Sequence, residues 1–393
     1  MFRRVEPPDF DPNAPPRPPN RLRVFSVEPT AVQVDWSTLG PGPVRFRASD
    51  TTREVVADGG PGAVVLEGLP ASSTVTIRVD GEGTAGEPVE LVARTLTPPP
   101  GEEIFRLGAI TDLHIGLARF GKAGTLTERP RPVVPHPIRC AGAATDAAQA
   151  WGAELILAKG DLTESSRPHH WTAVADLFAR AEVPMLISPG NHETHRKNTV
   201  DPVTEAGRHG LTVLRSSVEA TDHPGIRIIR GDTAIPETDQ GRIEHIADPI
   251  FDLAASSDRP VILAVHHHFE RWRHPIHPPP GIPGPESHRF LDRLSTIQPR
   301  TLITSGHTHR HRTRAHGSLV LAETGSTKDY PGTWTGYVVH EGGIRQVVRR
   351  IDEPSCIRWT EWTARAALGL WRHWSPGTLD ERCFSHRWPG AGS

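Results

Sequence analysis

The residues best suited to chemistry in this 393-residue chain are five short groups that contain aspartate, asparagine and histidine. The groups are Asp112-Leu113-His114, Gly160-Asp161, Gly190-Asn191-His192-Glu193, His266 and Gly306-His307-Thr308-His309. Imidazole, carboxylate and amide oxygen together suit iron, manganese or zinc, whereas cysteine would favour softer metals. The pattern therefore indicates a metal centre.

The order of the groups is more informative than any single one. An Asp-x-His triplet is expected by chance in a chain with 22 histidines and carries little weight alone. Gly190-Asn191-His192-Glu193 differs, because the chain has only four asparagines and chance would produce this type of tetrapeptide in roughly one of several hundred such chains. Histidines scattered at random would not give the ordered set, so we reject that alternative.

Each group follows an apolar run that we interpret as a buried strand. These strands are expected at Phe105–Ile110, Glu154–Ala158, Met185–Ser188, Pro260–Val265 and Thr301–Thr304. Helices are expected at about 139–151 and 166–181, and further strands at about 318–323, 336–340 and 344–351. The alternation predicts a layered α/β domain over residues 104–351. Such sheets bind ligands at the carboxyl ends of their strands, where the five groups fall.

The N-terminal quarter of the chain has a different pattern. Residues 1–20 contain seven prolines and are expected to form a disordered arm. Short alternating apolar runs with Gly-rich turns over residues 21–97 predict a small all-β sandwich. The segment Leu66-Glu67-Gly68-Leu69-Pro70, followed by an alternating strand, resembles a fibronectin type III module. Residues 98–103 are interpreted as a Pro-rich linker.

The C-terminal segment, residues 352–393, is rich in tryptophan. Five apolar residues are spaced 3, 4, 4 and 4 positions apart, namely Trp359, Trp362, Ala366, Leu370 and Trp374. This spacing predicts one amphipathic helix that ends at Ser375-Pro376-Gly377. We interpret its apolar stripe as extra core of the α/β domain, and a lid or a subunit contact is the alternative.

Composition excludes several classes of protein. The 44 Lys and Arg residues nearly balance the 46 Asp and Glu residues, so a dedicated nucleic-acid binder is not expected. Three scattered cysteines fit neither a disulfide framework nor a Cys-ligated zinc site. The N-terminus has no apolar stretch typical of a signal peptide, and no run is long enough to span a membrane. A cytoplasmic protein is therefore predicted, and its oligomeric state stays open.

The ordered set of motifs resembles the calcineurin-like metallophosphoesterase superfamily over residues 104–351. The resemblance implies a four-layer α/β/β/α sandwich, a centre of two metal ions (Fe, Mn or Zn) and a small-molecule phosphoester substrate. It also implies in-line attack on phosphorus by a hydroxide that bridges the two ions. Two ions can neutralise an anionic phosphoester and generate that nucleophile at neutral pH.

The same resemblance assigns a role to each motif residue. It implies that Asp112, His114 and His309 hold the first ion. It implies that Asn191, His266 and His307 hold the second, with Asp161 bridging both. His192 is then not a ligand but contacts the phosphoryl group or protonates the leaving oxygen as a general acid.

Residues beside the motifs leave alternatives open. His266 is preferred as the ligand over His267 and His268 because it directly follows the apolar strand, and the other two are either pocket or surface residues. Glu193 is expected to orient its neighbours, with a surface carboxylate as the alternative. His195 either reaches substrate or is solvated. Three arginines are interpreted as a solvated face rather than a phosphate contact, namely Arg310, Arg312 and Arg314. The insertion at residues 116–136 could shape a substrate pocket.

Three segments, 158–164, 183–184 and 189–193, look most like the class III cyclic-nucleotide phosphodiesterase branch, although Glu164 and His268-Phe269 depart from its usual residues. Purple acid phosphatases instead have a tyrosine ligand where this chain has Glu164. We therefore predict a phosphodiesterase. A phosphomonoesterase is the first alternative, and a catalytically silent binding module is the second.

Overall fold

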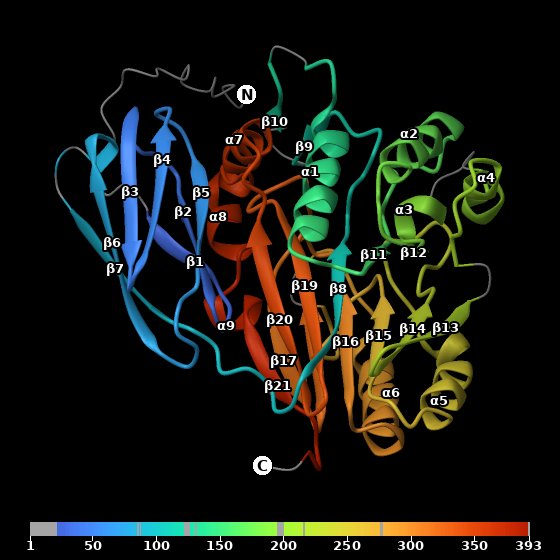
Figure 1. The fold of residues 1–393 in the computed structure, drawn as a ribbon. Helices are drawn as coiled ribbons and strands as arrows, with labels where there is room; N and C mark the ends of the chain where they lie inside the picture. Colours follow the sequence, from blue (N-terminus) through green and yellow to red (C-terminus); the bar gives the residue numbers. More distant parts are fainter. Residues whose placement is uncertain are drawn as a thin grey trace.

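The computed structural model describes residues 22–391 except 85, 87, 122–125, 130–131, 195–199, 215–216 and 276–277. The Pro-rich arm expected at residues 1–20 and the alternatives for His195 lie outside the described residues. The predicted mixed α/β fold is confirmed: two six-stranded sheets form the centre of the chain, and helices accompany them (Figure 1). No helix among the described residues is long and apolar enough to cross a membrane.

The first six-stranded sheet carries three of the motif-bearing strands side by side. Its order is β12 (Met185–Ser188), β11 (Leu155–Lys159), β8 (Glu103–Ile110), β19 (Thr333–His340), β20 (Gly343–Arg350) and β21 (Phe384–Arg387). Strands β8, β11 and β12 are parallel, so their carboxyl ends, and the motifs that follow them, meet at one edge.

The second six-stranded sheet carries the remaining two motif-bearing strands. Its order is β13 (Val218–His223), β14 (Ile226–Gly231), β15 (Val261–Val265), β16 (Thr301–Ser305), β18 (Leu319–Glu323) and β17 (Arg312–His316). Strands β14, β15, β16 and β18 are parallel, so the residues after β15 and β16 also share one edge.

Alternating side chains pack the two sheets against each other and against helices. In β11, Leu155 and Leu157 share a core with Ile262 and Ala264 of β15, whereas Ile156 faces the cluster that includes helices α1 (His136–Ala150) and α2 (Pro168–Phe178). The other face of β15 packs on α5 (Ala247–Ala255) and α6 (Gly284–Ile297). Strands buried on both faces explain the nearly continuous apolar runs in the sequence.

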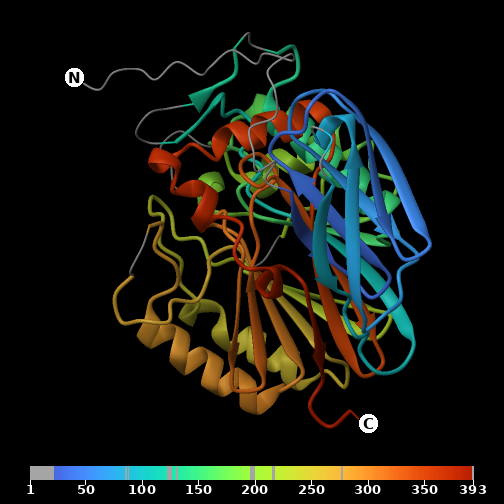
Figure 2. The same cartoon turned by 90° about the vertical axis from the view of Figure 1, so that its left-hand side faces the viewer.

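Residues 22–94 form two further sheets beside the first six-stranded sheet (Figures 1 and 2). One has the order β1 (Arg23–Val27), β2 (Ala31–Trp36) and β5 (Gly62–Glu67). The other has the order β4 (Thr51–Ala57), β3 (Gly42–Ala48), β6 (Thr74–Gly81) and β7 (Val89–Arg94). Trp36 and Phe46 stack between them, with ring centroids 5.5 Å apart. Arg350 of β20 bonds Asp35 of β2 through Nη1 at 2.7 Å, which fixes these sheets to the rest of the chain.

The single C-terminal helix predicted over residues 359–374 is wrong. The segment forms α7 (Pro354–Thr363), η3 (Ala367–Gly369), α8 (Trp371–Trp374) and α9 (Leu379–Arg382) before it joins the first sheet as β21. Three consecutive residues, 367–369, have left-handed φ values of 50°, 59° and 89°, which end helical propagation and turn the chain. The apolar stripe is broken as well, because Trp359 is buried whereas Leu370 and Trp374 are nearly half exposed.

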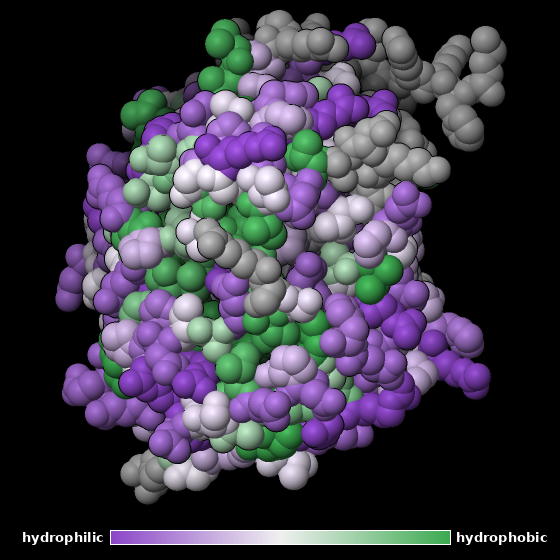
Figure 3. All heavy atoms as spheres, turned by 90° about the vertical axis from the view of Figure 1, so that its right-hand side faces the viewer, coloured by the Kyte–Doolittle hydropathy of each residue, from purple (hydrophilic) through white to green (hydrophobic). Residues whose placement is uncertain are grey.

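The face that carries α2, α4 (Pro202–Arg208) and α5 is mixed in character. Hydrophilic residues predominate around its rim, and apolar residues gather in a central band (Figure 3).

Candidate metal centre

The structure brings all eight predicted site residues to the edge where the two sheets meet. They are Asp112, His114, Asp161, Asn191, His192, His266, His307 and His309. Five of them have left-handed φ values between 49° and 69°, namely Asp112, His114, Asp161, His307 and His309. Non-glycine residues rarely adopt this conformation, and strained backbone of this kind concentrates at functional sites.

Two glycines of the motifs are required by close packing. A Cβ atom on Gly190 would lie 2.3 Å from Oδ1 of Asp161, and one on Gly306 would lie 2.5 Å from Oδ2 of Asp112. Both distances are shorter than real Cβ contacts, so a larger residue would displace a carboxylate of the site. Glycine is therefore needed at these two positions because it lets the backbone approach the carboxylates of the site closely.

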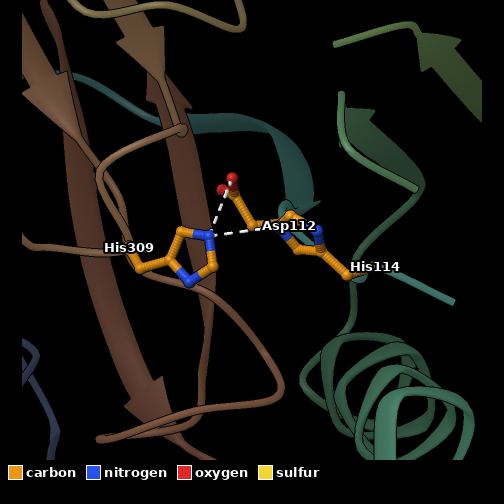
Figure 4. A group of neighbouring side chains, drawn as sticks. All are labelled: Asp112, His114 and His309. Carbon is orange, nitrogen blue, oxygen red and sulfur yellow. Dashed lines mark hydrogen bonds and ion pairs between the residues drawn. The ribbon is translucent and has the colours of Figure 1, made fainter. Parts of the chain in front are cut away.

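Asp112, His114 and His309 form the first half of the site (Figure 4). The Nε2 atoms of His114 and His309 face each other at 3.2 Å, and Nε2 of His309 lies 3.4 Å from Oδ1 of Asp112. Oδ1 of Asp112 also accepts a hydrogen bond of 3.0 Å from the backbone N–H of His307, which connects the strand end of β8 to that of β16.

The hydrogen bonds of the two Nδ1 atoms indicate which nitrogen of each imidazole carries the proton. Nδ1 of His114 lies 3.0 Å from Glu164 and Nδ1 of His309 lies 2.6 Å from Asp329, so each Nδ1 carries the proton that it donates to a carboxylate. In the neutral rings both Nε2 atoms then present lone pairs to each other. Such an arrangement is unfavourable unless a cation lies between them, so these residues fit a metal ion.

In the second half of the site, hydrogen bonds also hold one nitrogen of each imidazole, but the acceptors are backbone carbonyl groups. His266 donates Nδ1–H to the carbonyl oxygen of Lys159 at 2.9 Å, and its Nε2 faces Oδ2 of Asp161 and Oδ1 of Asn191, both at 3.1 Å. His307 donates Nε2–H to the carbonyl of Pro280 at 3.2 Å, which leaves its Nδ1 as the lone pair. The acceptor atoms thus converge here too, and the group of Asp161, His266 and His307 is buried.

The charge of Asp161 also favours a positive charge in the second half of the site. Burial disfavours the charged ring of His266, but the negative charge of Asp161 outweighs it and raises the pKa of His266 to about 9. Without a metal ion, a proton would therefore occupy the position between these acceptors. A metal ion that binds there must displace this proton.

Asp161 lies between the two halves. Its Oδ2 is 3.1 Å from Nε2 of His266 in the second half and 3.7 Å from Nε2 of His114 in the first half. Burial raises the cost of charging this carboxyl, but the neighbouring histidines outweigh burial and hold its pKa well below the usual range. Asp161 is therefore ionised and faces both groups.

His192 differs from the candidate ligands in exposure. Its backbone N–H donates to Oδ1 of Asp161 at 2.9 Å, and its Nδ1 donates to the carbonyl of Glu164 at 3.0 Å. Nε2 lies 4.0 Å from Oδ2 of Asp161, and the side chain is 20% exposed. Burial disfavours its charged form, but Asp161 and Glu164 outweigh burial and raise the pKa of His192 to about 10. The side chain of His192 therefore lies beside the centre and is partly exposed.

Glu193 orients its neighbours, as predicted, and the alternative of a surface carboxylate is wrong. The fully buried carboxylate accepts hydrogen bonds from the backbone N–H groups of Asp161, Thr163 and Gly190 at 3.0, 2.7 and 2.7 Å. Burial and the charge of Asp161 raise the pKa of Glu193 to about 7, and these bonds oppose the rise. Glu193 therefore joins the loop after β11 to the loop after β12.

The interpretation of the arginines after the last motif as a solvated face is wrong for Arg310. Its residue is only 5% exposed, and its guanidinium lies 5.5 Å from the ring centroids of both Trp371 and Trp374. His267 and His268, whose placement was left open, are both buried, and they contact Thr233 and Glu270. Both are pocket or core residues rather than surface ones.

Sequence reasoning missed the two carboxylates behind the first half. Glu164 follows Asp161 by three residues, and its departure from the related branch was the only signal of its importance. Asp329 stands in no motif, so nothing in the sequence pointed to it. The 116–136 insertion also approaches the site: its short hairpin β9 (Arg119–Phe120) and β10 (Leu126–Thr127) places the ring of Phe120 6.5 Å from that of His309.

Comparisons with known proteins agree with this site. Residues 105–311, more than half of the chain, match the family model of the calcineurin-like phosphoesterases. The chain is 26% identical over 180 residues to the 3',5'-cyclic adenosine monophosphate phosphodiesterase CpdA of Pseudomonas aeruginosa. That match covers 44% of this chain and 61% of the relative, which is less than two thirds of the relative's length.

Two solved structures are similar to this chain at low sequence identity. A purple acid phosphatase from yellow lupin (Lupinus luteus) is 12% identical with a TM-score of 0.45, over 85% of this chain and 72% of that chain. A PhoD structure is 10% identical with a TM-score of 0.43, over 84% of this chain and 87% of that chain. On the evidence of the family model, the chain belongs to the calcineurin-like phosphoesterase family.

Proposed function

We propose that the chain is a phosphodiesterase that works with two metal ions held at the meeting edge of the two sheets. The observation that carries the proposal is the convergence of imidazole nitrogens and carboxylate oxygens in two adjacent groups. Asp112, His114 and His309 would hold one ion. Asn191, His266 and His307 would hold the other, with Asp161 between them.

The bound ions would supply a nucleophile at neutral pH and neutralise the phosphoryl oxygens. The chain's own residues do the rest. Glu164 and Asp329 hold the Nδ1 protons of His114 and His309, which fixes the tautomer of both rings. The carbonyl of Glu164 fixes His192 through Nδ1, so Nε2 carries a transferable proton toward the centre. His192 would donate that proton to the departing oxygen.

Two observations favour a diester over a monoester. The relative from P. aeruginosa bears the name of a cyclic adenosine monophosphate phosphodiesterase. In addition, two buried lysines near the centre are committed elsewhere: Lys159 bonds Thr304 and Thr324 at 2.7 Å, and Lys328 bonds Asp329 at 3.3 Å. A monoester carries a second negative charge, and these two lysines are not available to neutralise it.

The packing of helices and sheets supports a division of the chain into a sandwich domain, an N-terminal module and a C-terminal extension. Helices α1 and α2 cover the outer face of one central sheet, and α5 and α6 cover the other, which supports a four-layer α/β/β/α sandwich over residues 104–351. The two N-terminal sheets support a fibronectin type III-like module at 21–97, followed by a linker at 98–103. Residues 352–393 would be an extension of the catalytic domain, since β21 pairs with β20.

The test compares turnover of bis-para-nitrophenyl phosphate with turnover of mono-para-nitrophenyl phosphate, and measures metal content on the same sample. We expect diester turnover and about two Fe, Mn or Zn ions per chain. Preference for the monoester would replace the diesterase by a phosphatase. Absence of bound metal after reconstitution with Mn or Fe would overturn the metal centre and favour a silent binding module.

A further inference from the structure

The C-terminal segment, residues 354–391, lies outside the part of the chain that matches the family model, yet it contacts the loop behind the first half of the site. Nε1 of Trp359 donates to the carbonyl of Lys328 at 2.6 Å, and the backbone N–H of Tyr330 donates to Oγ1 of Thr363 at 2.7 Å. Helix α7 therefore holds the two neighbours of Asp329 in place, one on either side.

A second contact reaches Asp329 itself. Nε1 of Trp371, in α8, donates to Oδ1 of Asp329 at 3.3 Å, while Oδ2 accepts the Nδ1 proton of His309 at 2.6 Å. Lys328 also donates to Oδ2, at 3.3 Å. The carboxylate is completely buried, so protein donors must satisfy both oxygens. A continuous hydrogen-bonded chain therefore runs from the C-terminal segment through Asp329 to His309.

The two oxygens of Asp329 bind different partners: Oδ1 accepts from Trp371, and Oδ2 accepts from His309. With Oδ1 bonded to the indole, the carboxylate cannot rotate without losing a hydrogen bond in a buried site, and this loss costs free energy. Oδ2 is consequently held toward Nδ1 of His309, which keeps the Nε2 lone pair of that ring directed at His114 and Asp112. Partners of this outer kind orient metal ligands and raise their basicity.

The indole of Trp371 is itself well fixed. Its ring lies 5.7 Å from Phe120 and 5.5 Å from the guanidinium of Arg310, the residue that follows His309. Its carbonyl accepts a hydrogen bond of 2.9 Å from Oγ of Ser375. The indole N–H therefore occupies a defined position beside Asp329.

We propose that Trp371 is a positioning residue for the metal centre, acting through Asp329 on His309, and that the C-terminal segment is thereby part of the metal-binding apparatus. This inference rests on the proposed two-ion centre. It assigns to α8 a function beyond the packing role that its tryptophans suggest.

The test uses three variants of the full chain. Trp371→Phe keeps the ring and removes the donor, and Asp329→Asn keeps the shape and removes the charge. Trp374→Phe is the matched control, because the rings of Trp371 and Trp374 lie equally far, 5.5 Å, from Arg310, and only Trp371 has a hydrogen bond to Asp329. For each variant, titration of the metal-free protein with Mn²⁺ gives the affinity for each ion, and thermal unfolding of the metal-free protein gives its stability.

We expect Asp329→Asn to weaken the affinity for one of the two ions by about 10- to 100-fold. Trp371→Phe should weaken the affinity for the same ion by about three- to tenfold, the effect of one hydrogen bond. Trp374→Phe should leave both affinities unchanged, whereas the metal-free Trp371→Phe protein should unfold at a somewhat lower temperature than Trp374→Phe, because it loses one hydrogen bond to a buried carboxylate.

Equal Mn²⁺ affinities in Trp371→Phe and Trp374→Phe would overturn the positioning role and leave Trp371 as packing. An Asp329→Asn protein that binds both ions as tightly as the unsubstituted chain would break the link between Asp329 and His309. Failure of the proposed function is a separate result, because the unsubstituted chain itself would then bind fewer than two ions.

Discussion

The two halves of the candidate metal centre each contain two imidazoles, but different groups accept the outer protons of these rings. In the first half, carboxylates accept the outer protons of both imidazoles, Glu164 for His114 and Asp329 for His309. In the second half, backbone carbonyls do so, that of Lys159 for His266 and that of Pro280 for His307. A charged acceptor makes the ring a stronger donor to a metal than a neutral one does.

This difference indicates that the two ions would not be held equally. The first half contains three carboxylates, one of them the candidate ligand Asp112 and two of them behind the histidines. The second half shares Asp161, and a further carboxylate, Asp239, accepts a bond of 3.4 Å from the amide of Asn191 rather than from an imidazole. We therefore expect a tightly held ion in the first half and a more exchangeable ion in the second.

The largest effect is expected where both halves meet. Asp161→Asn should remove both ions and nearly all phosphoesterase turnover, because the substitution removes an ionised group that faces the histidines of both halves. Metal content after dialysis and diester turnover measure this. Asp248→Asn, at an exposed surface position, is the control. Retention of two ions by Asp161→Asn would show that the halves are independent sites.

Removing one ligand from each half should separate them. His309→Ala and Asn191→Ala should each abolish nearly all turnover, since both ions are needed for the chemistry. The metal content should differ: Asn191→Ala should keep the ion of the first half, whereas His309→Ala should lose the more tightly held one. Titration with Mn²⁺ followed by mild chelation distinguishes the two. Identical behaviour of both variants would remove the proposed asymmetry.

His192 belongs to neither half, so its substitution should spare both. His192→Ala should retain two ions but lower kcat by about 10²- to 10⁴-fold, the range for loss of a general acid. The loss should shrink for a diester whose leaving group needs no proton, such as a para-nitrophenyl ester compared with an alkyl ester. Loss of a metal ion from His192→Ala would show that the residue is a ligand.

The smallest effect is expected when the acceptor of an outer imidazole proton is changed from a charged group to a neutral one. Glu164→Gln would give His114 a neutral partner, as His266 has, and should weaken the first ion about tenfold, at the low end of the range for outer-shell partners. The affinity for the second ion should change much less. Mn²⁺ titration measures both affinities. If the second ion weakens as much as the first, the carboxylate support is not specific to the first half.

Much of the fold could be predicted because its strands are buried on both faces. The strand expected at Met185–Ser188 has those bounds in the structure, and the strands ending before Asp112 and His307 differ from expectation by two residues or fewer. Continuous apolar runs identify such strands without knowledge of their neighbours. The helix expected over residues 359–374 failed for the opposite reason. Its spacing is local, but bonds to a distant loop and left-handed residues at 367–369 divide it.

The sequence by itself determined the metal chemistry. Eight motif residues follow apolar strands in a fixed order, so their placement at the carboxyl ends of parallel strands follows from strand assignment. The meeting of the two sheet edges required the packing of one sheet on the other. The supporting carboxylate Asp329 was decided only by the tertiary structure. It lies 20 residues from His309, in no motif, and contacts that ring because strands β17 and β18 return the chain to the site.

The placement of Trp371 was likewise a tertiary outcome. A tryptophan in an apolar stripe is indistinguishable from core by its spacing, and its indole N–H has no meaning until a buried acceptor lies opposite it. Here the acceptor is Asp329, 42 residues earlier in the chain. Ligand types are local properties of a sequence, whereas the hydrogen bonds that orient those ligands join residues that only the folded chain brings together.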